Sequence, residues 1–202
     1  MGDSEKKNTE NRILEAAEAE FLEQGYDGAR TISIAERAGV THAMLHYYFR
    51  TKEQLFHRIL EEKVDALVHS VVTAFINPEK PFLQRIEEGI SAHFDFLAAN
   101  PRIPLFIARE IGKRDLGIED KLRGNVAPLF MRIQSEINAL ADKGEVRSVD
   151  PVMLFLDIIS QNVFPFMILP IAAPALGISD SKALLERVKQ ENVIIILSRL
   201  KP

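Results

Sequence analysis

Apolar residues recur every three or four positions along most of this chain, and no segment sustains an alternation of apolar and polar residues. The first spacing places apolar side chains on one face of an α-helix, whereas alternation would indicate a half-buried strand. The sequence therefore predicts an all-α fold. Besides two short helices within residues 31–51, the expected helices cover residues 9–24, 52–74, 82–99, 104–114, 119–142, 151–169 and 181–200.

Glycine, proline and capping residues mark the expected helix ends. Gly25 is expected to stop the first helix, because glycine adopts the left-handed conformation that commonly ends one. Pro128 lies inside the helix predicted for residues 119–142 and is expected to kink or divide it, because proline has no N–H to donate. Asp150 and Pro151 are suited to the N-cap and the first position of the next helix.

Residues 31–55 are the most informative stretch of the chain. A short helical pattern runs to Gly39, and a second one begins after Val40 and Thr41. Two short helices around a glycine-containing turn make a helix-turn-helix, a device that places its second helix in the major groove of DNA. The apolar positions expected to face inward are Ile32, Ile34, Ala35, Ala38, Met44, Leu45, Tyr48 and Phe49.

The same residues carry a family resemblance. The segment resembles the N-terminal signature of the TetR (tetracycline repressor) family, and the similarity covers roughly the first third of the chain. The matching residues are Ile13-Leu14-x-Ala16-Ala17, Phe21, Gly25-Tyr26, Gly28, Ile34-Ala35, Ala38-Gly39-Val40, Leu45, Tyr48-Phe49 and Lys52-Glu53-x-Leu55. The chain departs from the family pattern at Arg30, Ile32, Ala43 and His46, the last of which stands where the family usually has tyrosine.

The resemblance implies two domains and a set of DNA contacts. A three-helix DNA-binding domain is expected over residues 1–51, and a larger helical domain that binds an effector and dimerises is expected over residues 52–202. In this interpretation Thr41, His42 and Ala43 face base edges. Phosphate contacts are expected from Thr31, His46, Tyr47 and Lys52. Two alternatives stay open: Thr31 is only a helix cap, and Thr41 caps the second helix while it also contacts DNA.

Charge is consistent with one small DNA-contacting face. The whole chain has a net charge of -4, which argues against a nucleic-acid binder that uses its entire surface. Residues 28–58 nevertheless hold five basic and two acidic residues, a local balance of +3. The alternative explanation of this balance is an ordinary solvated surface, and Arg50 in particular fits either interpretation.

The sequence offers little support for a catalytic or metal site. His42 and His46 are four residues apart, a spacing that can bind zinc on a helix. A metalloprotease-type site would need glutamate at position 43, where this chain has Ala43, and no third ligand is evident nearby. No phosphate-binding glycine loop or nucleophile motif is present, so we expect no enzyme, no metal and no cofactor.

Cysteine is absent and the first residues are polar, which favours a cytoplasmic protein without a signal peptide. The longest apolar run, residues 163–178, contains Pro165, Pro170 and Pro174. That run is too short and too often broken by proline to predict a membrane span. We therefore expect no membrane partner.

The second domain is expected to bind a small, largely apolar effector. Its many apolar and aromatic side chains mainly indicate core packing, and in the resembled family the corresponding helices also surround a ligand cavity. Polar residues on these apolar helices are candidate ligand anchors. They are His93, Arg109, Gln134, Asp157, Gln161 and Asn162. The alternative for Asp157, Gln161 and Asn162 is a place in the subunit interface.

The last two long helices are predicted to form a homodimer. Residues 152–169 and 193–197 are apolar around much of their circumference, as expected of helices that are buried on two sides. A two-fold dimer would present two recognition helices to a palindromic operator on double-stranded DNA. The sequence thus predicts a sequence-specific repressor that a small molecule releases from DNA. The alternative is a helical protein-interaction adaptor that does not bind DNA.

Overall fold

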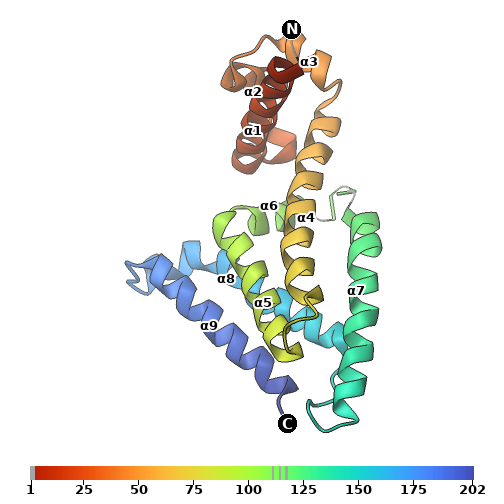
Figure 1. Ribbon diagram of the computed structural model, residues 1–202. Helices are drawn as coiled ribbons and strands as arrows, with labels where there is room; N and C mark the ends of the chain where they lie inside the picture. Colours follow the sequence, from red (N-terminus) through yellow and green to blue (C-terminus); the bar gives the residue numbers. More distant parts are fainter. Residues whose placement is uncertain (1–2, 111, 114, 117) are drawn as a thin grey trace. The chain divides into compact units, whose positions relative to one another are not determined.

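The computed structural model describes residues 3–110, 112–113, 115–116 and 118–202, and its regular elements in these ranges are all α-helices. The all-α prediction is therefore confirmed for the described residues (Figure 1). The helices are α1 (Asp3–Gly28), α2 (Thr31–Ala38), α3 (His42–Tyr48), α4 (Lys52–Ile76), α5 (Phe82–Ala99), α6 (Ile103–Glu110), α7 (Ile118–Ala141), α8 (Pro151–Ala175) and α9 (Ser181–Leu200).

The chain divides into two compact units. The N-terminal unit contains residues 1–64 together with residues 106–118, and the C-terminal unit contains residues 65–105 and 119–202. Helix α4 contributes residues to both units, so the second unit begins inside this helix and not at its start.

Most helix bounds agree with the periodicity of the sequence. Helices α5 and α9 begin and end where the apolar spacing predicts. Helix α1 begins six residues before the expected Thr9, at Asp3, because its first turns are polar and solvent-exposed and so leave no apolar pattern. Helix α6 ends at Glu110, and Arg114, the predicted end, lies outside the described residues.

Gly25 interrupts the helical geometry of α1. Its backbone has φ 71° and ψ 173°, a combination that is essentially restricted to glycine. The predicted stop is therefore a kink, and the helical hydrogen bonding resumes for one short turn that ends at Gly28. The side chain of Arg109 on α6 lies close to the Cα atom of Gly25. A Cβ atom added to Gly25 would be 3.0 Å from the guanidinium carbon of Arg109.

Aromatic packing organises the N-terminal unit. The rings of Phe21 and Phe56 meet edge to face with centroids 5.3 Å apart, and Tyr26 and Phe56 do the same at 4.9 Å. Phe106 of α6 packs against the other side of Phe56 at 5.7 Å. These rings join α1, α4 and α6 in one hydrophobic core, on which α2 and α3 pack through Ile34 and Leu45. Ile32, which was expected to face inward, is exposed instead.

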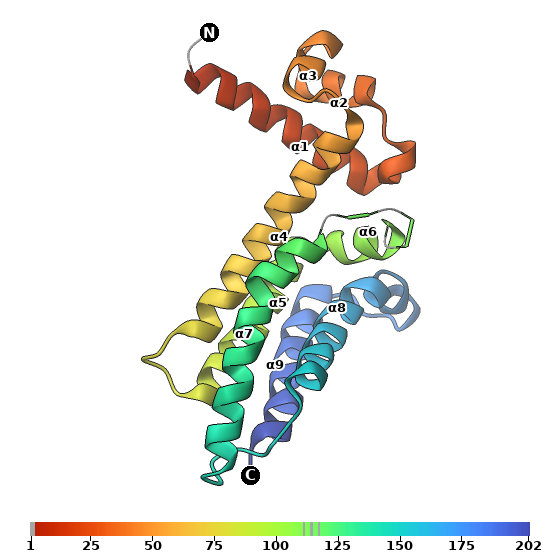
Figure 2. The ribbon, with the colours of Figure 1, turned by 90° about the vertical axis from the view of Figure 1, so that its right-hand side faces the viewer.

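Helices α5, α8 and α9 pack against one another in the C-terminal unit, and Figure 2 shows α8 and α9 side by side. Their shared core contains Ile86, Ile90, Leu154, Ile196 and Leu200, all buried. The backbone N–H of Arg147 also donates to the carbonyl of Leu200 at 2.8 Å, which attaches the segment before α8 to the end of α9. Asp150 caps α8 by accepting from the Val152 N–H at 2.8 Å, as its position before Pro151 predicts.

The prolines in the interior of α7 and α8 do not divide these helices. Helix α7 runs undivided through Pro128, so of the two effects expected there the kink stays a prediction, and α8 runs through Pro165, Pro170 and Pro174 to Ala175. Pro165 cannot donate to the carbonyl of Gln161 four residues earlier. The side-chain amide of Asn192 on α9 donates to that carbonyl at 2.8 Å instead. A neighbouring helix thus satisfies the acceptor that the proline leaves free.

We predict that Gly25→Ala lowers the free energy of unfolding of the N-terminal unit by about 1–3 kcal/mol, because alanine is strained in this backbone conformation. Urea denaturation followed by far-ultraviolet circular dichroism measures the change. Gly28→Ala is the matched control, since Gly28 lies in the same unit and its φ is not in the left-handed region. Equal stability of the two variants would contradict the strain argument.

Candidate nucleic-acid interface and ligand cavity

The turn between α2 and α3 is closed by three capping interactions. Gly39 ends α2 in the left-handed conformation at φ 64°, and the Val40 N–H donates back to the Ala35 carbonyl at 3.0 Å. The Arg12 guanidinium of α1 donates to the carbonyls of Ala38 and Gly39, the second at 3.1 Å. Thr41 caps α3 by accepting from the Met44 N–H at 3.2 Å. The helix-turn-helix is therefore held in one conformation.

Helix α3 has one buried face and one exposed face. Leu45 is buried, and Phe49 follows it into the core. The outward side of the helix carries Tyr47, whose side chain is 74% exposed. The predicted DNA-facing residues Thr41, His42, Ala43 and His46 are all exposed on the same short element. The structure thus brings together the five predicted contacts of residues 41–47 on one accessible surface.

Thr31, His42 and His46 form a chain of side-chain contacts between α2 and α3. The Thr31 Oγ1 and His42 Nε2 atoms are 3.0 Å apart, and the two histidine Nε2 atoms are 3.1 Å apart. His46 Nδ1 is 3.3 Å from the carbonyl of Arg50, so this nitrogen must be the donor of that bond. The hydroxyl of Thr31 is therefore directed at α3. Arg30, which precedes it, is the N-cap of α2 and makes no side-chain capping bond.

The two histidines do not belong to a larger metal-ligand cluster in the described part of the chain. No group of three or more histidine, cysteine, aspartate or glutamate side chains converges among those residues. Their contact is a hydrogen bond with the rings edge to face, centroids 4.4 Å apart. The geometry thus links the start of α2 to α3.

Lys52 has a structural role that its position in the sequence did not reveal. Its ammonium donates to the carbonyls of Tyr26 at 2.8 Å and Ala29 at 3.1 Å, and it lies 4.5 Å above the centre of the Tyr26 ring. These contacts tie the start of α4 to the segment between α1 and α2. Two of the three ammonium protons are used in this way, which leaves one for a phosphate oxygen.

Ion pairs reduce the local positive charge that the sequence indicates. Arg37 donates to the Glu23 carboxylate at 3.0 and 2.8 Å, and this hydrogen bond raises the pKa of the Arg37 guanidinium. Arg58 pairs with Glu62 at 3.1 Å. Arg30 and Arg50 are exposed. They are the basic side chains of residues 28–58 that are best placed to meet a polyanion.

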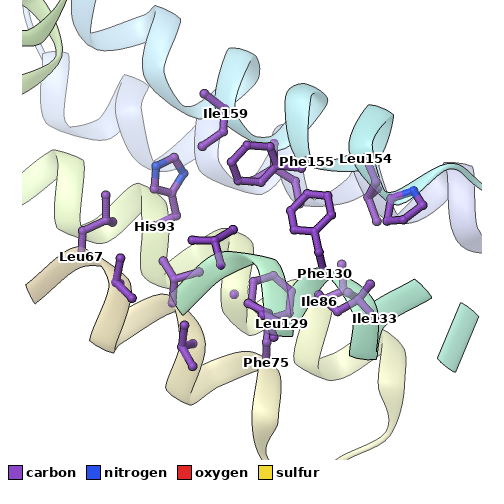
Figure 3. Close-up of a pocket in the computed structure, with 17 residues that line it drawn as sticks. Leu67, Phe75, Ile86, His93, Leu129, Phe130, Ile133, Leu154, Phe155 and Ile159 are labelled. Carbon is purple, nitrogen blue, oxygen red and sulfur yellow. The ribbon is translucent and has the colours of Figure 1, made fainter. Parts of the chain in front are cut away.

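The C-terminal unit contains an apolar cavity of about 130 Å³. Seventeen residues from α4, α5, α7 and α8 line it, and His93 is the only one of them with a polar side chain (Figure 3). Phe75, Phe130 and Phe155 supply aromatic walls, and Leu67 and Ile159 are among the aliphatic ones. A concave apolar site with a single polar group is typical of sites for small molecules.

The N-terminal segment matches a known family model. Residues 13–59 match the model described as "Bacterial regulatory proteins, tetR family", which spans the helix-turn-helix and the start of α4. Solved structures of TetR-family regulators share the architecture of the whole chain. The chain carries a TetR-family DNA-binding segment over residues 13–59. It is thus a DNA-binding transcriptional regulator with a helix-turn-helix, as the resemblance of its first third predicts.

Relatives of this TetR-family chain show how far the similarity extends. The nucleoid occlusion factor SlmA of Vibrio vulnificus is 27% identical over 149 residues, 73% of this chain and 74% of that protein. The transcriptional activator FasR of Mycolicibacterium smegmatis is 35% identical over 86 residues, 43% of this chain and 39% of that protein. A TetR-family regulator from Marinobacter aquaeolei has a TM-score of 0.73 at 14% identity and covers 99% of both chains.

The six candidate effector anchors of this TetR-family protein occupy different environments. His93 lines the cavity, and Asn162, which is 0% exposed, donates to its Nδ1 at 3.2 Å and to the Ile90 carbonyl at 2.9 Å. Gln134 is bonded to Asn138 in α7 at 2.9 Å, and Asp157 forms an ion pair with Arg199. Of the six, only His93 lines the cavity, and Asn162 contacts its ring.

Each of the remaining two anchor candidates takes part in a hydrogen bond to a backbone carbonyl, that of Phe21 for Arg109 and its own for Gln161. Arg109 belongs to the N-terminal unit, where its guanidinium donates to the Phe21 carbonyl at 3.1 Å. The Gln161 carbonyl accepts from Asn192, which also donates to the Asn162 side-chain oxygen at 3.0 Å. Sequence reasoning missed Asn192. Its position as a polar residue directly before the apolar run of residues 193–197 is the signal that could have found it.

Burial keeps His93 uncharged. Desolvation lowers the pKa of its imidazole to about 4, because the charged form loses its hydration in this site. The side chain is therefore a neutral hydrogen-bonding group at physiological pH.

We predict that Lys52→Met lowers the free energy of unfolding of the N-terminal unit by about 1–3 kcal/mol, because two carbonyls lose a charged donor while the aliphatic stem is kept. Thermal or urea denaturation measures the effect. Arg50→Met is the control. It removes an exposed cation next to the same helix start and should change the stability by no more than about 0.5 kcal/mol. Equal effects of the two substitutions would show that the ammonium does not stabilise the unit.

Proposed function

We propose that this TetR-family regulator is a homodimeric repressor that binds an inverted-repeat operator and is released when a small molecule occupies the cavity. The exposed face of α3 carries the proposal. A capped, rigid helix presents base-reading and phosphate-binding side chains together, and its N-terminus favours a nearby phosphate. The apolar faces of α8 and α9 support the homodimer, and the cavity supports the effector.

The DNA contacts divide by chemistry. Thr41, His42 and Ala43 stand at the start of α3, the end that meets base edges in helix-turn-helix complexes. Tyr47 has an exposed side chain whose hydroxyl suits a phosphate oxygen. Both ring nitrogens of His46 already have partners, the Arg50 carbonyl and His42, so its phosphate bond would replace one of these contacts. Thr31 and Lys52 would contact phosphate at the two sides of the motif. Both also hold the motif together internally, so their contribution to DNA binding includes its pre-organisation.

The exposed apolar surface of α8 and α9 supports a homodimer. Phe164 on α8 is 59% exposed and Ile194 on α9 is 61% exposed. Val152, Leu156, Ile168 and Ile171 on α8 recur at helical spacing and are exposed as well. An apolar surface of this extent on two adjacent helices matches a self-complementary two-fold interface. Such a dimer would present two copies of α3 to the two halves of an inverted repeat.

Helix α8 is also long and apolar enough to cross a membrane, judged by length and composition alone. Three prolines and the fully buried Asn162, which bonds to α5 and α9, favour a helix that packs within a protein. We therefore assign its exposed face to a second copy of the chain.

Effector and DNA are expected to oppose each other. An effector that prefers a conformation in which the two α3 helices are wrongly spaced for the operator will weaken DNA binding. By thermodynamic linkage, bound DNA weakens the binding of the effector by the same factor. The size of this coupling is typically about 1–3 kcal/mol.

Selection of the full-length protein on a random pool of double-stranded DNA, followed by sequencing, tests the proposal. An enriched inverted repeat is the expected result and would establish both sequence-specific binding and two-fold symmetry. A reporter gene behind that repeat then distinguishes repression from activation. If neither the protein alone nor the protein with cavity ligands enriches a motif, the adaptor alternative replaces the repressor.

We predict that Tyr47→Phe weakens binding to all DNA sequences by roughly three- to tenfold, because one phosphate hydrogen bond is lost. His42→Ala should instead change the preference among sequences by an amount equivalent to about 1–3 kcal/mol at one position of each half-site. Fluorescence anisotropy at fixed salt concentration with a panel of single-base operator variants measures both effects. A uniform loss for His42→Ala would assign that residue to the backbone and not to a base.

We predict that Phe164→Glu converts the dimer to monomers at micromolar concentration, because a carboxylate would be buried without a partner in the interface. Sedimentation velocity measures the mass. Ile32→Glu is the control: Ile32 is 59% exposed on α2, in the N-terminal unit and not on α8 or α9, and its substitution should leave the dimer intact. Dissociation by both variants, or by neither, would exclude this face as the interface.

A further inference from the structure

The cavity of the C-terminal unit has a single polar side chain, His93, and the hydrogen bonds around it determine where its proton lies. Asn162 donates through Nδ2 to the Ile90 carbonyl at 2.9 Å, and its Oδ1 accepts from Asn192 at 3.0 Å. A carbonyl cannot donate, so the orientation of the Asn162 amide is defined from both of its ends.

The same amide nitrogen lies 3.2 Å from His93 Nδ1. Because the Asn162 nitrogen is a donor, Nδ1 must be the acceptor and carries no hydrogen. A neutral imidazole holds its proton on the other nitrogen, so Nε2–H is a donor. No hydrogen bond from the described residues to His93 Nε2 is present. Nε2 is therefore the ring atom that remains for a ligand.

The cavity has no charge to match an ionised ligand. Its other sixteen lining residues are apolar or glycine, and no lysine or arginine is among them. An ionised carboxylate would lose its hydration here without gaining a cation, which is strongly unfavourable. A neutral carbonyl oxygen has a far smaller desolvation cost, and one hydrogen bond from Nε2 offsets it.

The volume of the cavity indicates the size of the ligand body that fits between its walls. A cavity of about 130 Å³ is close to the engineered protein cavity of about 150 Å³ that binds benzene. Phe75, Phe130 and Phe155 form walls against which an aromatic or cyclic body can pack.

We propose that the effector of this cavity is a compact, uncharged, largely apolar molecule with one hydrogen-bond acceptor, which accepts from His93 Nε2–H. The proposal rests on the function proposed above, in which the cavity holds the effector. It adds the chemical class of that effector and the residue that selects it.

Three probes of similar shape separate the contributions: acetophenone has a neutral acceptor, ethylbenzene has none, and benzoate is charged. Each is titrated into the full-length protein and into His93→Leu by ligand-observed nuclear magnetic resonance at pH 7. Loss of one hydrogen bond should weaken acetophenone by roughly three- to tenfold in the variant, while ethylbenzene binds as well or better. Benzoate should bind neither protein measurably.

Infrared spectroscopy of bound acetophenone gives a readout that needs no variant. Its carbonyl stretch should shift to lower frequency in the wild-type protein, because the carbonyl accepts a hydrogen bond, and the shift should be absent in His93→Leu. An unshifted stretch in the wild type would overturn the assignment of His93 Nε2–H as the donor, whether or not the variant folds.

The remaining outcomes separate the two levels of the proposal. If both neutral probes bind but His93→Leu weakens them equally, the cavity is a ligand site and the role of His93 is wrong. Benzoate bound as tightly as acetophenone would overturn the uncharged class. If none of the three probes binds, the cavity itself fails as the effector site, and the proposed function loses its inducible part while DNA binding remains to be judged separately.

Discussion

The amide of Asn192 supplies the hydrogen bond that Pro165 removes from α8, and much of the C-terminal unit depends on this replacement. Without a donor, the Gln161 carbonyl would be a partly buried, unpaired acceptor in the middle of a long apolar helix. With it, α8 continues to Ala175 and presents one continuous apolar face. The same amide orients Asn162, which in turn sets the tautomer of His93 at the cavity. One side chain on α9 thus connects helix continuity, the exposed face and the chemistry of the ligand site.

The N-terminal unit follows a different principle, in which residues that are exposed for recognition are also held from within. Lys52 binds two backbone carbonyls before any phosphate is present, and Thr31 and the two histidines are already in contact across α2 and α3. Arg12 closes the turn from α1. A surface arranged in advance loses less conformational entropy when it binds. Substitutions at these positions therefore have to be compared with a stability measurement before their effect on DNA affinity is interpreted.

The apolar cavity and the proposed DNA-contacting surface of α3 differ in polarity because their proposed ligands differ in charge. A phosphate backbone requires exposed donors and cations, which stay hydrated until contact. The cavity has apolar walls and one polar side chain, His93, so an unpaired charge would lose its hydration there without gaining a partner.

Helix positions, the helix-turn-helix and the family resemblance were all readable from the sequence, because they depend on local periodicity, capping and turn residues. Asp150 and Pro151 predicted the start of α8, and the spacing of residues 82–99 and 181–200 predicted α5 and α9.

Ile32 was expected to face inward but is exposed, because helical spacing alone does not fix which position at the edge of the apolar face of an eight-residue helix is buried. Of the kink or division expected at Pro128, α7 shows no division, because an interrupted hydrogen bond need not end a helix that tertiary contacts support. Only the folded structure decided that Arg109 binds α1, that Lys52 secures the segment before α2, and that His93, Asn162 and Asn192 meet. These partners are between 23 and 88 residues apart, and a contact of that kind is set by how helices pack and not by the pattern within any one of them.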